Sequence, residues 1–251
     1  MILKDIAFLA SDTIRTKAYM QYMIKADKKP SICVVFSENV KKMRTEAENY
    51  QSEDRFEKEG EAIYFDRNIP LLCTLEEAQI QYIAIETRDI NSMEMEECIL
   101  HLNQKYIIYS GYGGYILKKH LFETGKQFIH IHAGILPKYR GSTTVYYSLL
   151  QEGTIGATAI FLNEGIDEGS IITKETFPMP EEKVDFDYIF DPHIRASVLL
   201  KVINLYLENG ALESEMQKAS LSETYYIIHP VLKHLAILKA ERGVKERMKM
   251  L

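Results

Sequence analysis

The sequence predicts an α/β fold: a Rossmann-like, mostly parallel sheet flanked by helices. Short runs rich in Val, Ile and Leu alternate with segments of helical periodicity as far as His132, and this alternation is typical of βαβ units in a parallel sheet. Farther on, residues 170–177 alternate apolar and polar side chains, which predicts a strand antiparallel to residues 157–162. The last part of the chain has helical periodicity, so a helical C-terminal extension is expected.

The N-terminal part begins with an apolar run at residues 6–10 that ends in Ser11-Asp12-Thr13. This pattern predicts a buried strand that leads into the cap of a helix over residues 13–25. A second strand is expected at residues 32–36, where β-branched side chains dominate. Residues 38–61 are mostly charged and polar, and the sequence leaves open whether they form a solvated helix or a loop.

The middle of the chain continues the alternation. A helix is expected over residues 93–102, because its apolar side chains recur at spacings of three and four. Strands are expected at residues 63–65, 81–87 and 106–109, and residues 71–73 form a further short apolar piece. The strand at 106–109 runs directly into Ser110-Gly111-Tyr112-Gly113-Gly114.

The C-terminal part is mainly helical in pattern. One helix is expected over residues 186–207 with Gly210 as its C-cap, and Pro230 begins another. A chain of 251 residues can build one sizeable core. We therefore expect an α/β domain over residues 1–180 and a helical extension, residues 181–251, packed on it.

Composition excludes several classes of protein. The formal net charge of −6 argues against a large nucleic-acid footprint, because neutralising phosphates requires clustered Lys and Arg. The cysteines Cys33, Cys73 and Cys98 are widely spaced, which suits a reducing compartment and favours neither disulfides nor a structural zinc site. The N-terminal apolar run is too short for a signal peptide. We expect a cytoplasmic protein without a membrane span.

Three strand ends are candidate sites. In parallel α/β sheets, ligands bind at the carboxyl ends of the strands, beside the point where the strand order reverses. The candidates are residues 10–13, 110–114 and 132–134. The first turn lacks the glycines that let backbone amides approach a phosphate, so a phosphate site there would depend on Ser11 and Thr13. Helix capping explains these two residues equally well.

Titratable side chains gather at the end of the apolar, strand-like run that begins at Phe128. His130 and His132 are two residues apart, so on a strand they point to the same face. Asp167 lies in the turn Gly165-Ile166-Asp167-Glu168-Gly169, where the glycines permit a tight turn. If this turn meets His132, its carboxylate can orient the imidazole for general acid–base catalysis. A packed core histidine, an ordinary turn aspartate and a metal site of all three residues are the alternatives.

Residues 130–141, HIHAGILPKYRG, resemble the signature of the folate-dependent formyltransferases. This family includes methionyl-tRNA formyltransferase, glycinamide ribonucleotide transformylase and the sugar-nucleotide N-formyltransferases. The matching positions are His132, Leu136-Pro137, Arg140-Gly141 and the turn of residues 165–169. The resemblance covers roughly residues 80–180 and includes the loop of residues 111–117. It departs from the family at His130, where the family has asparagine, and at the glycine-free turn near Ser11.

The resemblance implies a reaction and a set of site residues. It implies formyl transfer from N10-formyltetrahydrofolate to an amine, with His132 as proton acceptor, Asp167 as its partner and His130 as donor to the oxyanion. No metal is expected. The implied cofactor-binding residues are Tyr109, Gly111, Tyr112, Gly113, Leu136, Leu162 and Gly165. The implied substrate-binding residues are Ser11, Thr13, Arg140 and Tyr146.

The amine acceptor is expected to be an amino sugar, most simply one linked to a nucleotide. The tRNA enzyme carries a further basic C-terminal domain, whereas this chain has about 70 residues after Pro180 and is acidic. Tyrosine pairs such as Tyr146-Tyr147 and Tyr225-Tyr226 could stack on a base, although packing explains them as well. Glycinamide ribonucleotide, or a binding module without turnover, are the alternatives. A homodimer is a further expectation that the sequence leaves open.

Overall fold

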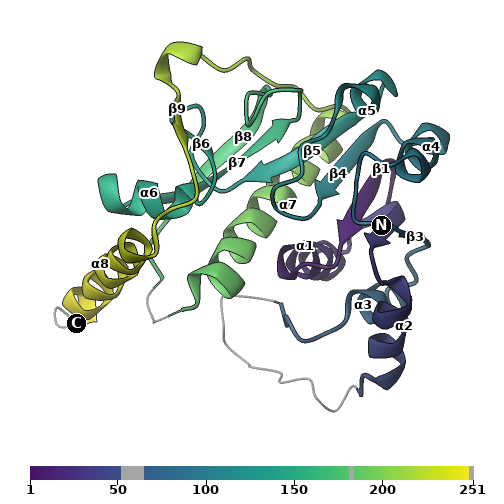
Figure 1. Cartoon of the computed structure of the whole chain (residues 1–251), viewed down its shortest axis with the longest axis horizontal. Helices are drawn as coiled ribbons and strands as arrows, with labels where there is room; N and C mark the ends of the chain where they lie inside the picture. The colour runs from purple at the N-terminus through teal and green to yellow at the C-terminus, as the bar shows by residue number, and fades with distance from the viewer. Residues whose placement is uncertain (52–64, 181–183, 249–251) are drawn as a thin grey trace. The chain divides into compact units, whose positions relative to one another are not determined.

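The computed structural model describes residues 1–51, 65–180 and 184–248 (Figure 1). The chain forms two compact units, Met1–His130 and Ile131–Leu251. The boundary falls inside strand β5 (Gln127–His132), and each unit is described by itself. The expected boundary at residue 180 stays a prediction.

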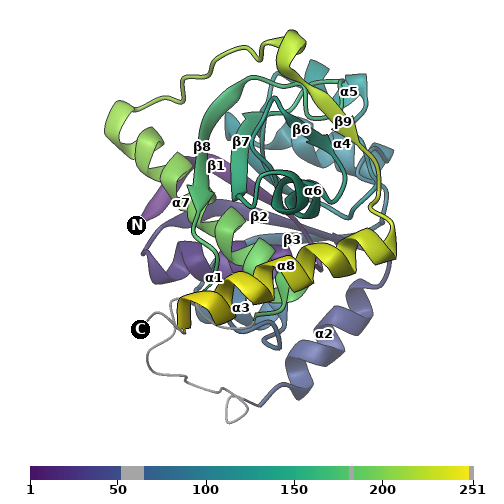
Figure 2. The same ribbon diagram turned by 90° about the vertical axis from the view of Figure 1, so that its left-hand side faces the viewer.

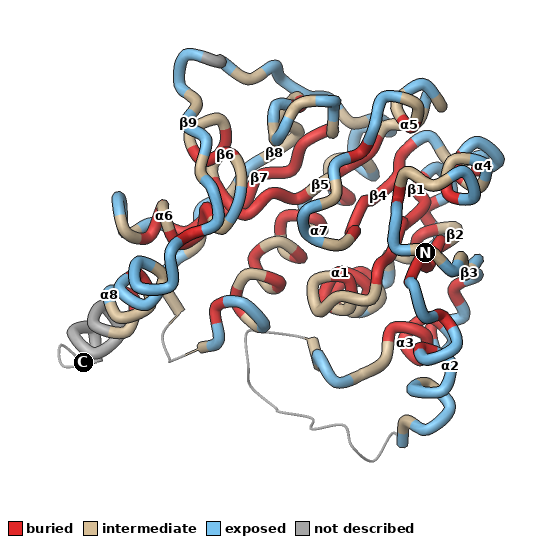
Figure 3. The backbone as a smooth tube through the Cα atoms, in the orientation of Figure 1, coloured by how far each residue is buried: buried red, intermediate tan, exposed pale blue. Residues whose placement is uncertain are grey.

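The N-terminal unit is built on a parallel sheet. Its strands are β1 (Ile2–Ser11), β2 (Lys29–Ser37), β3 (Tyr82–Glu86), β4 (Tyr106–Ser110) and the start of β5. Their order is β3-β2-β1-β4-β5 and every neighbouring pair is parallel. The second half of β1 and all of β4 are buried (Figure 3), as expected for strands covered on both faces. The predicted mostly parallel α/β sheet is confirmed.

Helices connect these strands. They are α1 (Ile14–Lys25), α2 (Val40–Asn49), α3 (Leu71–Glu77), α4 (Met93–His101) and α5 (Lys119–Glu123). Side chains cap three of them: Thr13, Asn39 and Ser92 each accept a hydrogen bond from a backbone N–H in the first turn. α3 contacts both α1 and α2.

The structure resolves or corrects several points that the sequence left open in this unit. The question left open for residues 38–61 is answered in part, because residues 40–49 are helix α2. The apolar piece at 71–73 begins helix α3. Of the expected strand at 63–65, Phe65 is not in a strand and its ring lies against Tyr22, while residues 63 and 64 lie outside the described residues. The short helix α5 has no counterpart among the expected elements.

The strand order reverses beside β1. From β1 the chain adds β2 and β3 on one side, then crosses to β4 and β5 on the other. Ala10 of β1 is therefore in register with Ser110 of β4, and two of the predicted strand-end sites are neighbours. This is the position at which open α/β sheets bind ligands.

The C-terminal unit contains the predicted antiparallel pair, β7 (Ile155–Phe161) and β8 (Ile171–Phe177). Its helices are α6 (Thr144–Gln151), α7 (Asp191–Asn209) and α8 (Pro230–Met248), with a π-helical turn, η2 (Phe186–Phe190), before α7. α7 packs on β7 and β8, and α6 packs against α8 (Figure 2). Gly210 ends α7 at φ 72°, which confirms the predicted C-cap.

A small second sheet was not expected. β6 (Tyr139–Gly141) pairs in parallel with β9 (Glu223–Tyr225), and a 3₁₀ turn, η3 (Ala219–Leu221), precedes β9. The pairing ties the chain after α7 back to the segment that follows the histidines. In the described part of the chain, no helix is long and apolar enough to cross a membrane.

Candidate active site

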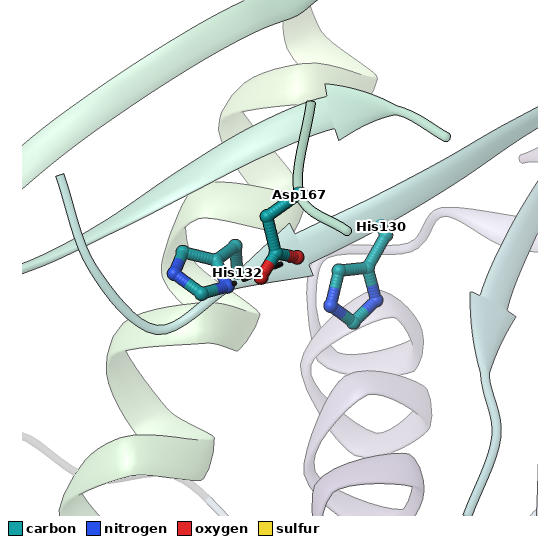
Figure 4. Close-up of side chains that lie close together, drawn as sticks. All are labelled: His130, His132 and Asp167. Atoms are coloured by element: carbon teal, nitrogen blue, oxygen red, sulfur yellow. Dashed lines mark ion pairs between the residues drawn. The ribbon is translucent and has the colours of Figure 1, made fainter. Parts of the chain in front are cut away.

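Both ring nitrogens of His132, the last residue of β5, have a partner, and Figure 4 shows the one that faces Asp167. Its Nε2 lies 2.6 Å from the carbonyl oxygen of Tyr139, and its Nδ1 lies 3.3 Å from Oδ1 of Asp167. The residue is buried, at 4% exposure. The contact between the Asp167 turn and His132, which the sequence analysis gave as the condition for acid–base catalysis, is therefore present within the C-terminal unit.

The partners of His132 fix its tautomer. A carbonyl oxygen can only accept, so Nε2 carries a proton and donates a hydrogen bond to the carbonyl oxygen of Tyr139. In neutral imidazole, Nδ1 then presents a lone pair toward the carboxylate of Asp167. This repulsion between lone pairs is relieved when a proton enters between Nδ1 and Oδ1. The position between Nδ1 of His132 and Oδ1 of Asp167 can therefore accept a proton from a third group.

Asp167 is held in place by the backbone around it. Its φ of 54° lies in the left-handed region, which costs a non-glycine residue about 1 kcal/mol and is tolerated best by Asp and Asn. Its second carboxylate oxygen, Oδ2, accepts a hydrogen bond of 2.8 Å from the N–H of Gly141. Only a glycine fits at 169, because a Cβ there would lie 1.6 Å from the carbonyl oxygen of Phe161. The turn is thus strained, tightly packed and oriented toward His132.

His130 lies two residues before His132 on the same strand and is half-buried. Its ring centroid is 6.4 Å from that of Tyr109. His130, His132 and Asp167 each offer one ligand atom, and these atoms lie within 4.8 Å of one another (Figure 4). Two imidazoles and a carboxylate could hold a transition metal ion. They equally suit proton transfer beside a hydrogen-bond donor.

Two expected substrate-binding residues make contacts within the protein. Arg140 is buried, and its guanidinium donates to Oε1 of Gln217 and of Glu168. Tyr146 is also buried, and its hydroxyl donates to Asp187. Burial, followed by this hydrogen bond to a carboxylate, raises the pKa of Tyr146. In the described structure both side chains make hydrogen bonds within the C-terminal unit.

The other two expected substrate-binding residues lie in the N-terminal unit. Ser11 is buried and its hydroxyl donates to the carbonyl of Ser110 at 2.8 Å, and Thr13 caps α1. Sequence reasoning did not single out Arg15, whose guanidinium donates to Oγ of Ser110 and to the carbonyl of Gly111. The signal that could have found Arg15 is its place just after a strand end that leads to a candidate loop.

The expected cofactor residues at the end of β4 show one unusual feature. Tyr109 is buried, yet its hydroxyl has no hydrogen-bond partner among the described residues. Burial raises its pKa to about 12, and a neutral phenol can donate a hydrogen bond. Gly111 is buried and Gly113 is exposed. The ring of Tyr112 packs edge to face with Phe36, and the guanidinium of Arg88 lies 4.9 Å from the centroid of the Tyr112 ring.

The remaining expected cofactor residues lie in the C-terminal unit, near Asp167 in the sequence or in the loop after His132. Leu136 is fully buried and its N–H donates to Oγ1 of Thr158. Leu162 and Gly165 are half-buried and flank the start of the Asp167 turn. The N–H of Gly165 donates to Asn163.

Cavities open among the described residues of the N-terminal unit. One of about 460 Å³ lies beyond the ends of β1 and β2 and includes Asp12, Ser37 and Tyr112 in its lining. Another, of about 620 Å³, includes the cations Lys17, Lys42 and Arg67 and one carboxylate, Glu46. The second cavity therefore has the charge that suits an anionic ligand.

The family model and the curated relatives that match this chain name the same family. The family model described as formyl transferase matches residues 4–186. Among curated proteins, the methionyl-tRNA formyltransferase of Finegoldia magna is 30% identical over 99 residues, which cover 39% of this chain and 32% of that protein. The enzyme of the same name from Ruminiclostridium cellulolyticum is 27% identical over 145 residues, covering 57% and 46%. The matches thus span less than half of these relatives.

Solved structures share the fold at low sequence identity. An N-formyltransferase from Helicobacter canadensis, in complex with folinic acid and dTDP-3-aminofucose, superposes with a TM-score of 0.57 at 17% identity over 95% of this chain and 80% of that one. A sugar N-formyltransferase from Shewanella gives 0.56 at 15% over 95% and 88%. Glycinamide ribonucleotide transformylase 1 from Symbiobacterium toebii gives 0.54 at 15% over 85% and 93%.

Proposed function

The chain belongs to the formyl transferase family, and we propose that it transfers the formyl group of N10-formyltetrahydrofolate to the amine of an amino sugar that is linked to a nucleotide. The observation that carries this proposal is the contact of 3.3 Å between Nδ1 of His132 and Oδ1 of Asp167, with Nε2 of His132 held by Tyr139. This arrangement provides a proton acceptor at a fixed position.

The proposed reaction needs one proton relay. The amine nitrogen attacks the formyl carbon and forms a C–N bond, and the carbonyl oxygen becomes an oxyanion. The attacking nitrogen loses a proton to the His132–Asp167 pair. The bond from the formyl carbon to N10 then breaks, and N10 takes up the proton. Because His132 is buried while Asp167 and His130 are half-buried, the amine approaches from the side of these two residues.

His130 supports the proposal as the donor to the oxyanion. An imidazole N–H can donate one hydrogen bond in the neutral form and a stronger one when protonated. Its position on the same strand face as His132 places that donor beside the proton acceptor. A preorganised donor at the developing charge is often the largest single contribution to catalysis.

One of the expected folate-binding residues, Tyr109, has a buried hydroxyl to which a bound pterin could offer a partner. Tetrahydrofolate supplies the formyl group, and its polar pterin edge offers acceptors. The buried hydroxyl of Tyr109 lacks a partner among the described residues, and a buried unpaired donor is costly unless a ligand satisfies it. Backbone groups of residues 111–114 and 162–167 are the further proposed contacts.

The nucleotide is proposed to use the cationic cavity of the N-terminal unit. Lys17, Lys42 and Arg67 outnumber the single carboxylate in its lining, which suits a diphosphate. In substrate titrations, Lys17→Ala and Lys42→Ala are expected to raise the KM for the nucleotide sugar several-fold and to leave the KM for the folate unchanged. An unchanged KM for the sugar in both variants would contradict this assignment.

The function is tested with an assay for released tetrahydrofolate. The acceptors are a panel of 3-amino and 4-amino sugar nucleotides, with glycinamide ribonucleotide and methionyl-tRNA as further members. We expect release with an amino sugar nucleotide. Release with glycinamide ribonucleotide alone would move the proposal to that substrate. His101→Ala is a matched control, because His101 is an exposed histidine of α4.

Folate binding and turnover, measured together, distinguish an enzyme from a binding module without turnover. Isothermal titration with a non-reactive folate analogue should show binding whether or not the correct amine is in the panel. The transferase proposal would be abandoned if no folate analogue binds. Folate binding without turnover for any amine would favour the binding module.

A further inference from the structure

Gln217 uses its whole side-chain amide to join a buried arginine to the turn that carries Asp167. Its Nε2 donates to the carbonyl of Asp167 at 2.8 Å and to the carbonyl of Gly169 at 2.7 Å. Its Oε1 accepts from Nη2 and Nε of Arg140 at 3.0 and 3.3 Å. Because both donors and the acceptor are occupied, the amide has one orientation that satisfies all of its hydrogen bonds.

The burial and the planar shape of Arg140 suit it to bind the side-chain amide of Gln217. Only 7% of the residue is exposed, and its planar guanidinium presents donors in a fixed fork. The third contact of the fork is with Oε1 of Glu168, inside the same turn, at 3.3 Å. Arg140 thus contacts the Asp167 turn directly through Glu168 and indirectly through Gln217.

The backbone on both sides of Gln217 is anchored as well. Ile171 and Glu215 exchange two backbone hydrogen bonds of 2.8 Å, which fix the chain two residues before Gln217 to strand β8. Farther on, β9 pairs with β6. Gly141 of β6 is at φ 96°, and a Cβ there would lie 2.1 Å from the carbonyl oxygen of Tyr225. This close approach positions the Gly141 N–H that donates to Oδ2 of Asp167.

These contacts hold Asp167 from two directions. Its carbonyl is bound by Gln217 and its carboxylate by Gly141, while its own backbone is in the left-handed region. A strained conformation persists only when its surroundings determine it. We propose that Gln217, oriented by Arg140, is a positioning residue that fixes Asp167 against His132 and makes the segment of residues 215–225 part of the catalytic site. The kinetic consequence rests on the proposed function.

The first test needs no substrate. The ¹⁵N resonances of the His132 ring report its protonation and the partner at Nδ1. Gln217→Ala should shift the Nδ1 resonance of His132, because the carboxylate loses its position. The matched control is Asn209→Ala, since the side-chain amide of Asn209 also donates to a backbone carbonyl, that of Leu205 in α7. An unchanged Nδ1 resonance in a folded Gln217→Ala protein overturns the proposal.

The second test measures turnover. Gln217→Ala should lower kcat about 10- to 100-fold, the loss expected when a catalytic group is displaced by about 1 Å, with both KM values unchanged. Gln217→Glu retains an acceptor for Arg140 but loses the two donors, so it should lower kcat to a similar extent. Wild-type kcat in Gln217→Glu overturns the role of the donors. Asn209→Ala should keep wild-type kcat.

The two tests separate two kinds of failure. If the wild-type protein shows no formyl transfer but the Nδ1 resonance shifts in Gln217→Ala, the proposed function fails and the positioning role stands. If Gln217→Ala does not fold, Arg140→Lys provides the same test, because lysine retains the charge but lacks the fork that holds Gln217. A wild-type Nδ1 resonance in folded Arg140→Lys overturns the part assigned to Arg140.

Discussion

Two polar turns of this chain differ in what their side chains do. At Ser11 to Thr13, the side chains are used to hold the backbone: Ser11 donates to the Ser110 carbonyl and Thr13 caps α1. At the Asp167 turn the relation is reversed, because backbone and neighbouring side chains hold the turn and leave its carboxylate facing His132. Polar residues at strand ends indicate a catalytic position when other groups satisfy the local hydrogen bonds.

The largest effect is expected at the Asp167 turn. Asp167→Asn and His132→Ala should each lower kcat/KM about 10²- to 10⁴-fold, the range for loss of general acid–base catalysis. The circular dichroism spectrum should be unchanged for Asp167→Asn, which preserves the shape of the side chain. A variant of either residue with near wild-type turnover in the tetrahydrofolate assay would remove the pair from the mechanism.

Gly169→Ala tests the packing of the same turn. The added methyl group would meet the Phe161 carbonyl, so the turn must shift and Asp167 with it. We expect a fall of about 2 kcal/mol or more in the free energy of unfolding, measured by urea titration, together with lost turnover. The control is Gly113→Ala, because no heavy atom lies within 4 Å of a Cβ at that exposed glycine. Equal stability of the two variants would show that the turn adapts.

His130→Asn restores the residue that the resembling family has at this position. An asparagine amide can donate to the oxyanion as the imidazole does, so turnover should be retained or raised. The measurement is kcat beside that of His130→Ala, which lacks a donor and should be slower. An inactive His130→Asn enzyme would show that His130 has another role.

A substitution in the turn of Ser11 to Thr13 should change the free energy of unfolding. Thr13→Ala removes the cap of α1 and should lower the free energy of unfolding by about 1 kcal/mol. Thr13→Ser keeps a capping hydroxyl and should recover most of that loss. Urea unfolding of the three proteins measures both values, and equal stability of Thr13→Ala and wild type would contradict the capping role.

The smallest effect is expected for metal removal. Although the two histidines and Asp167 could hold an ion, the proposed reaction uses them for a proton and a hydrogen bond. Dialysis against a chelator should therefore leave turnover unchanged. Loss of turnover that returns with a divalent cation would require a different mechanism.

Much of the fold could be read from the sequence because its signals are local. Apolar runs predicted β1, β2 and β4, alternation predicted the β7–β8 pair, and Gly210 marked the end of α7. The same is true of part of the site, since two histidines on one strand face and a Gly-x-Asp-x-Gly turn are patterns of near neighbours. Residues 40–49 were ambiguous because a solvated helix carries few apolar side chains.

Only the tertiary structure decided what these residues contact. Gln217 lies 50 residues from Asp167 and 77 from Arg140, in a polar stretch with no periodic signal. Hydrogen bonds between residues so far apart in the sequence depend on how β6, β8 and the chain before β9 come together. The sequence by itself therefore determined the sheet, the histidine pair and the aspartate turn. The folded chain determined that Asp167 is fixed against His132, because that position is set by long-range hydrogen bonds.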